Sequence, residues 1–86
     1  MDLSSRAVKA TVQLWGLAQF KGRSADAPGA VGQALIWHGN GYSTEIVAVD
    51  PKNNRVLTKS GSVYQLGVPN LGFAAKNPQI LKELGF

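Results

Sequence analysis

The chain has 86 residues, enough for one domain and not two, and its balance of 44% hydrophobic and 16% charged residues excludes a disordered composition. It contains no cysteine, so disulfides and thiolate metal sites are excluded and a reducing, cytoplasmic compartment is favoured. The formal net charge of +4 favours encounter with nucleic acid or with acidic proteins through the long-range field.

No membrane association is expected. The first residues lack the positive and then apolar pattern of a signal peptide. No apolar run approaches the roughly 18 residues that a membrane span needs.

The first predicted element is an amphipathic helix over residues 4–20. Ser4 or Ser5 can cap it, because a side-chain hydroxyl accepts a hydrogen bond from a free N–H of the first turn. A strand is the alternative for the same residues, since Thr11 and Val12 are β-branched. The helix prediction rests on apolar residues spaced at three and four positions: Ala7, Val8, Val12, Leu14, Trp15, Leu17 and Ala18.

Residues 21–32 are interpreted as a linker. Its glycines and Pro28 interrupt any regular element. The stretch is long for a connection without secondary structure in so small a domain, and such loops are often functional or mobile.

A sheet is predicted over residues 33–66. Pro51 and an asparagine at 53 or 54 indicate one turn, and the glycine of Ser60-Gly61 indicates a tight hairpin. The strand 42–50 has apolar residues on both faces, which indicates a central position. The four predicted strands are residues 33–38, 42–50, 55–59 and 62–66.

A short helix is predicted over residues 77–84. Asn77 serves as its cap, Pro78 suits the first helical position, and Gly85 ends it. The predicted fold class is therefore α+β: an N-terminal helix, a three- or four-stranded antiparallel meander and a C-terminal helix. A small SH3-like open barrel with helical ends is the alternative, because short twisted strands readily curl.

The chain offers few residues for catalysis. His38 is the single histidine, and the five carboxylates are scattered without ligand-like spacing. The serines lack the strand-to-helix turn of a nucleophile elbow. We expect no enzyme, no cofactor and no metal site in a single copy. An oligomer that repeats His38 at its interfaces is the one remaining route to an active site.

One candidate binding surface is predicted on the sheet. Basic side chains around an exposed tyrosine are a common way to hold single-stranded nucleic acid. Tryptophan is enriched at interface hot spots, although packing in the core is the simpler role for it. The candidate residues are Lys52, Arg55, Lys59, Tyr42, Tyr64 and Trp15.

The second half of the chain carries a family resemblance. A strand begins at Ser43-Thr44, and residues 60–67 form a Ser-Gly-Ser-x-Tyr-x-Leu-Gly return strand. In this pattern, residues 42–67 resemble small uncharacterised proteins of bacteriophages, plasmids and other mobile elements. The resemblance implies an accessory role in a bacterial or phage-infected host cell.

Three functions follow in order of preference. The first is a non-enzymatic protein-interaction module, in the role of an accessory or inhibitory factor, because the chain combines a self-sufficient small fold with no catalytic constellation. The second is a nucleic-acid-binding module that uses the basic hairpin. The third is a ligand or enzyme site formed only in a homo-oligomer.

Overall fold

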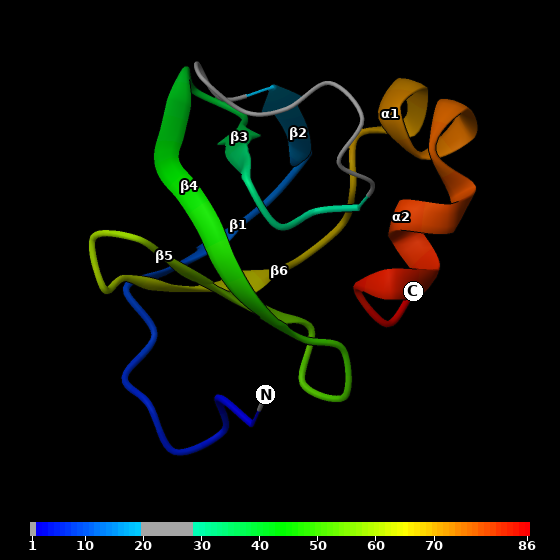
Figure 1. The fold of residues 1–86 in the computed structure, drawn as a ribbon. Coiled ribbons are helices and arrows are strands. Elements are labelled where there is room, and N and C mark those ends of the chain that lie inside the picture. Colours follow the sequence, from blue (N-terminus) through cyan, green and yellow to red (C-terminus); the bar gives the residue numbers. More distant parts are fainter. Residues whose placement is uncertain (1, 20–28) are drawn as a thin grey trace.

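The computed structural model describes residues 2–19 and 29–86, and its strands form one curled sheet (Figure 1). The strand order is β1-β6-β5-β4-β3-β2, and only the β1–β6 pair is parallel within the described residues. The elements are β1 (Ala10–Val12), β2 (Gly16–Gln19), β3 (Gln33–Trp37), β4 (Gly41–Asp50), β5 (Arg55–Thr58), β6 (Val63–Leu66), α1 (Leu71–Lys76) and α2 (Pro78–Glu83).

The four predicted strands are confirmed as β3 to β6, each antiparallel to the next. The turn residues act as expected: Asn54 and Gly61 both take positive φ, at 52° and 90°. β4 is central, between β3 and β5. The sheet is nevertheless larger than the predicted meander, because the described part of the chain adds a strand at each edge.

The predicted N-terminal helix is wrong over its described residues, 4–19. This segment instead holds β1 and β2, which pair with β6 and β3 at the two edges of the sheet. Trp15 continues the run by bridging Pro69 just after β6. Pairing with distant strands overrides a helical spacing that is only a weak local preference. The sheet curls into a half-barrel, closer to the alternative of an open barrel.

Residues 20–28, which include the end of the predicted helix and most of the predicted linker, lie outside the described residues. The last residues of the linker are fixed against the rest of the domain. Ala30 is fully buried, and its N–H donates to the Glu83 carboxylate at 2.9 Å. The N–H of Gly32 donates to the carbonyl of Ile46 at 2.8 Å.

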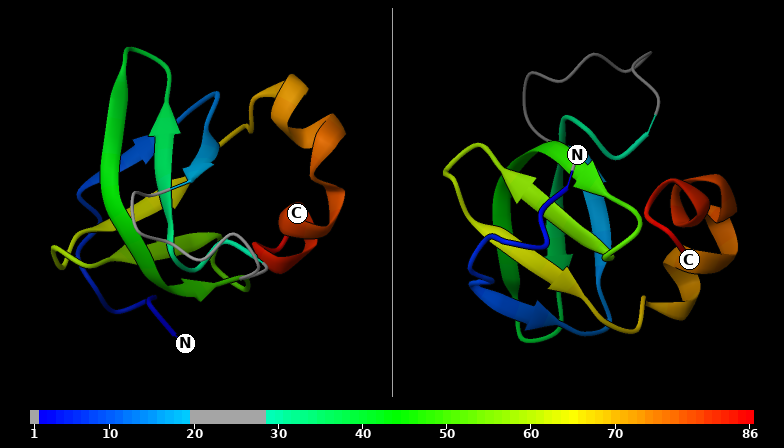
Figure 2. Two further views of the ribbon diagram at one scale, coloured as in Figure 1. Left: turned by 45° about the horizontal axis from the view of Figure 1, so that its top comes forward. Right: turned by 90° about the horizontal axis from the view of Figure 1, so that it is seen from below.

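Two short helices follow the sheet and lie together at one side of it (Figure 2). α1 was not predicted from the sequence. Its cap is Asn70, whose side chain accepts a hydrogen bond from the N–H of Phe73 at 3.0 Å. The predicted C-terminal helix is confirmed as α2, with Pro78 in its first turn and Gly85 at φ 88° after its end. Neither helix is long and apolar enough to cross a membrane, within the residues described.

Trp15 joins the helices to the sheet. Its side chain is fully buried, and its Nε1 donates to the carbonyl of Gly67 at 2.9 Å. Its ring lies 5.8 Å from that of Phe73 and 5.5 Å from that of Phe86, so it contacts both helical segments. The surrounding core includes Val12, Leu35, Ile46, Val56, Leu66, Leu81 and Leu84.

Residues 2–4 form an N-terminal strap across the ends of β4 and β5. Leu3 is fully buried, its N–H donates to Asp50 at 2.7 Å, and its carbonyl accepts from Arg55 at 3.0 Å. Hydrogen bonds from Leu3 and then from Asn53 lower the pKa of the Asp50 carboxyl below its ordinary 3.8. Asp50 thereby fastens the strap in its ionised form.

Candidate functional site

A groove of about 450 Å³ opens where four parts of the fold meet. These parts are the bend between β1 and β2, the end of β3, the β3–β4 turn and the start of α1. Its walls include Leu14, Ile36, Trp37, residues 38–40, Asn70 and Phe73. We call this the Leu14 groove. Its volume lies in the lower part of the range for small-molecule clefts.

Leu14 has an unusual backbone conformation. Its φ is +51°, a left-handed value that costs a bulky residue about 1–2 kcal/mol. Surrounding hydrogen bonds hold it there: its N–H donates to the carbonyl of Val68 at 2.7 Å, and the N–H of Val68 donates to the Gln13 side chain at 2.7 Å. The side chain of Leu14 is 46% exposed, so burial of the other half offsets part of this cost, by about 1 kcal/mol.

The groove lies within a wider area of exposed apolar side chains. Ile36 is 40% exposed on β3, and Val68, bonded to Leu14, is 58% exposed. Tyr42 pairs with Ile36 across the β3–β4 ladder and is 78% exposed. A group of exposed large apolar residues of this kind is typical of an interaction surface.

Three polar side chains border the groove, those of His38, Asn40 and Asn70. Asn70 already caps α1, whereas the side chains of His38 and Asn40 have no protein partner among the described residues. No group of three or more potential metal ligands occurs in that part of the chain. The side chains of His38 and Asn40 are both exposed at the edge of the groove.

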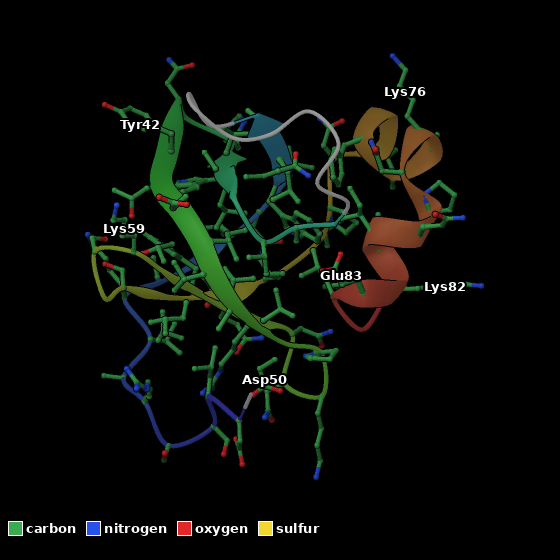
Figure 3. The ribbon with its side chains drawn as sticks, in the orientation of Figure 1. Tyr42, Asp50, Lys59, Lys76, Lys82 and Glu83 are labelled. Carbon is green, nitrogen blue, oxygen red and sulfur yellow. The ribbon has the colours of Figure 1, made fainter. Side chains whose placement is uncertain are left out.

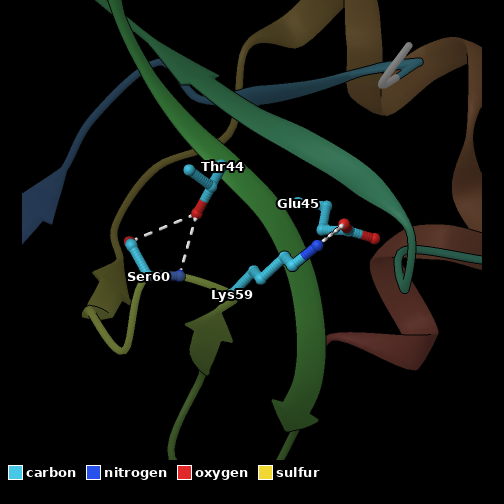
Figure 4. Close-up of polar contacts among 4 residues, drawn as sticks. All are labelled: Thr44, Glu45, Lys59 and Ser60. Atoms are coloured by element: carbon cyan, nitrogen blue, oxygen red, sulfur yellow. Dashed lines mark hydrogen bonds and ion pairs between the residues drawn. The ribbon is translucent and has the colours of Figure 1, made fainter. Parts of the chain in front are cut away.

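The structure brings two of the predicted surface residues to the same part of the sheet. Tyr42 and Lys59 lie on the same side in Figure 3. Lys59 is 73% exposed and forms an ion pair with Glu45, with Nζ 3.6 Å from Oε1. Beside it, Thr44 and Ser60 bond through their hydroxyls at 3.2 Å (Figure 4). This end of the sheet therefore presents one aromatic ring, one lysine paired with a glutamate, and two hydroxyls that bond each other.

The other two basic candidates lie at the opposite end of β4. Lys52 is exposed in the β4–β5 turn. Arg55 is half-buried, and its guanidinium is occupied by Gln65 at 2.8 Å and by the carbonyls of the N-terminal strap. Arg55 thus has a structural role, and the predicted basic surface is divided between two ends of the sheet.

The two remaining candidates are inside the protein. Trp15 is fully buried, and Tyr64 is 5% exposed with its ring 5.1 Å from that of Trp37. The prediction overlooked Leu14, Ile36 and α1. The sequence held a usable signal for the exposure of Ile36. β3 has apolar residues on both faces, and one of those faces has to meet solvent or a partner.

Comparison with protein-family models, with curated proteins and with solved structures finds no match for this chain. The resemblance of residues 42–67 to proteins of mobile elements therefore stays a prediction.

Proposed function

We propose that this chain is a non-enzymatic protein-interaction module that binds a partner protein through the Leu14 groove. The observation that carries the proposal is the gathering of exposed apolar side chains around this opening, with Leu14 held in a strained conformation beside it. Strained residues persist where surrounding structure enforces them, and they concentrate at functional sites.

The test compares two truncations that remove similar side chains from similar surroundings. Ile36 lines the groove and is 40% exposed, whereas Val47 on β4 is 44% exposed and does not line it. Immobilised wild type, Ile36→Ala and Val47→Ala are each incubated with lysate of the source cells, and retained proteins are quantified by mass spectrometry. We expect a retained partner to be lost with Ile36→Ala and kept with Val47→Ala. Equal retention by both variants would refute the proposal.

Nucleic-acid binding is a second candidate, supported by the exposed ring of Tyr42 near Lys59. Base stacking on an aromatic ring contributes about 1–3 kcal/mol per base. We expect Tyr42→Ala and Lys59→Glu to weaken binding of a labelled single-stranded oligonucleotide, measured by fluorescence anisotropy at low salt. An affinity unchanged by both substitutions, or no anisotropy change with wild type, would dismiss this candidate.

A further inference from the structure

The turn between β3 and β4 contains a chemically reactive pair of residues. Asn40 is followed by Gly41, and it is the only one of the chain's five asparagines that has a glycine after it. In such a pair the backbone nitrogen of the glycine can attack the side-chain amide of the asparagine, because the glycine has no side chain to hinder the approach. Spontaneous deamidation begins with this attack.

The structure explains why both members of the pair are present. Asn40 has a φ of +64°, a left-handed value that asparagine and glycine tolerate better than most residues. A Cβ at residue 41 would collide with the indole ring of Trp37. That ring packs on the buried Tyr64, with the two ring centroids 5.1 Å apart. The turn and the core beside it therefore require a reactive pair at this place.

The side chain of Asn40 is not restrained in the folded chain. Asn40 is exposed, and its amide has no protein partner among the described residues. The attack requires this side chain to rotate until its Cγ meets the backbone nitrogen of Gly41. An exposed side chain without hydrogen bonds can make this rotation.

The other four asparagines are protected in two ways. Each is followed by a residue larger than glycine, and Pro78 after Asn77 also has no N–H to lose. Each also has a side-chain hydrogen bond that holds the amide away from its own backbone. These bonds join Asn53 to the Asp50 carboxylate at 2.8 Å, Asn54 to the carbonyl of Leu84 at 2.9 Å, Asn70 to the N–H of Phe73 at 3.0 Å, and Asn77 to the carbonyl of Phe73 at 3.0 Å.

We propose that Asn40 is a modification site, at which the folded chain deamidates without an enzyme. The nitrogen of Gly41 bonds to Cγ of Asn40 and gives up its proton, and the Cγ–Nδ2 bond breaks to release ammonia. Water then adds to either carbonyl carbon of the resulting succinimide ring and opens it to aspartate or isoaspartate. The inference goes beyond the proposed function and does not depend on it.

The modification changes the edge of the Leu14 groove. Asn40 lines this groove, and no carboxylate lines it among the described residues, so either product introduces a negative charge there. Aspartate tolerates the left-handed backbone and preserves the turn. Isoaspartate carries the chain through its side-chain carbon and lengthens the backbone, which disturbs the pairing of Trp37 with Gly41.

The experiment incubates the full chain at mildly alkaline pH, where the Gly41 amide loses its proton more readily. Peptide mapping by mass spectrometry follows each asparagine over time, and electron-transfer fragmentation distinguishes isoaspartate from aspartate. We expect Asn40 to be converted about tenfold faster or more than any other asparagine, and both products to form there.

Two matched substitutions test the assignment on the whole protein. Asn40→Gly keeps the left-handed backbone and removes the amide, so the acidic species seen by isoelectric focusing should not form. Asn70→Gly replaces a helix cap, where glycine costs only a few tenths of a kcal/mol, and the acidic species should form as in wild type. Circular dichroism verifies that both variants are folded.

Three results would overturn the proposal: modification spread evenly over the asparagines, no conversion of Asn40, or an acidic species that persists in Asn40→Gly. The first two are measured on wild type alone, so they decide the matter even if a variant does not fold.

Discussion

Removal of the Leu3 side chain should destabilise the whole domain, although Leu3 lies close to the chain end. Leu3 is fully buried, and truncation of a buried leucine to alanine costs about 2–5 kcal/mol. A domain of this length has a total stability of about 4–13 kcal/mol at roughly 0.05–0.15 kcal/mol per residue. Its hydrogen bonds to Asp50 and Arg55 use only backbone atoms of Leu3, so Leu3→Ala isolates the packing contribution.

Urea denaturation followed by tryptophan fluorescence gives the free energy of unfolding, and a thermal melt gives the midpoint. At the lower limit of 2 kcal/mol, the melting temperature of Leu3→Ala falls by about 8–16 °C. Leu71→Ala is the control, because Leu71 is 79% exposed and its truncation should change stability by less than about 0.5 kcal/mol. If Leu3→Ala proves no less stable than Leu71→Ala, the strap does not contribute to the core as argued.

Three further predictions concern stability. The folded-state pKa of Asp50 is below its ordinary value of 3.8, so its stabilising effect is present at neutral pH and is lost as the pH falls below about 4. In melts recorded at several pH values, Asp50→Asn should reduce the fall of the melting temperature at acid pH. Gly61→Ala should cost about 1–2 kcal/mol from its φ of 90° alone, because the added methyl group meets open space. Gly85→Ala should cost more, because its methyl group would also collide with the carbonyl oxygen of Pro51. Equal urea midpoints for the two variants would contradict this ranking. Trp15→Phe removes the donor to Gly67 and should cost about 1–3 kcal/mol, or more if packing is also lost, and a calorimetric midpoint equal to that of wild type would count against the buried hydrogen bond.

The local signals in the sequence were reliable where a residue type has a conformational requirement of its own. An asparagine at 53 or 54 and Gly61 indicated turns because both residue types tolerate positive φ, and in the structure Asn54 and Gly61 have it. Pro78 and Gly85 likewise indicated the two ends of α2. These requirements depend on neighbours in the chain and not on distant contacts, so the four central strands and the last helix could be predicted.

The Leu14 groove could not be predicted in this way, because its walls come from residues 14, 36–40 and 70–73. Its existence depends on the bent segment that pairs with β6 on one side and β3 on the other. The prediction of a basic surface was wrong for the corresponding reason. The alternation of residues along the strand predicted an exposed Arg55, but the N-terminal strap lies against it.

The sequence by itself determined the turns that join the central strands and the order of those strands, because turn residues act through their own backbone preferences. Only the tertiary structure decided that residues 10–12 and 16–19 are strands and that Leu14 is exposed between them. A helical spacing of apolar residues and a bent edge strand can bury the same Val12 and Trp15, and the long-range pairing with β6 and β3 selects the strand.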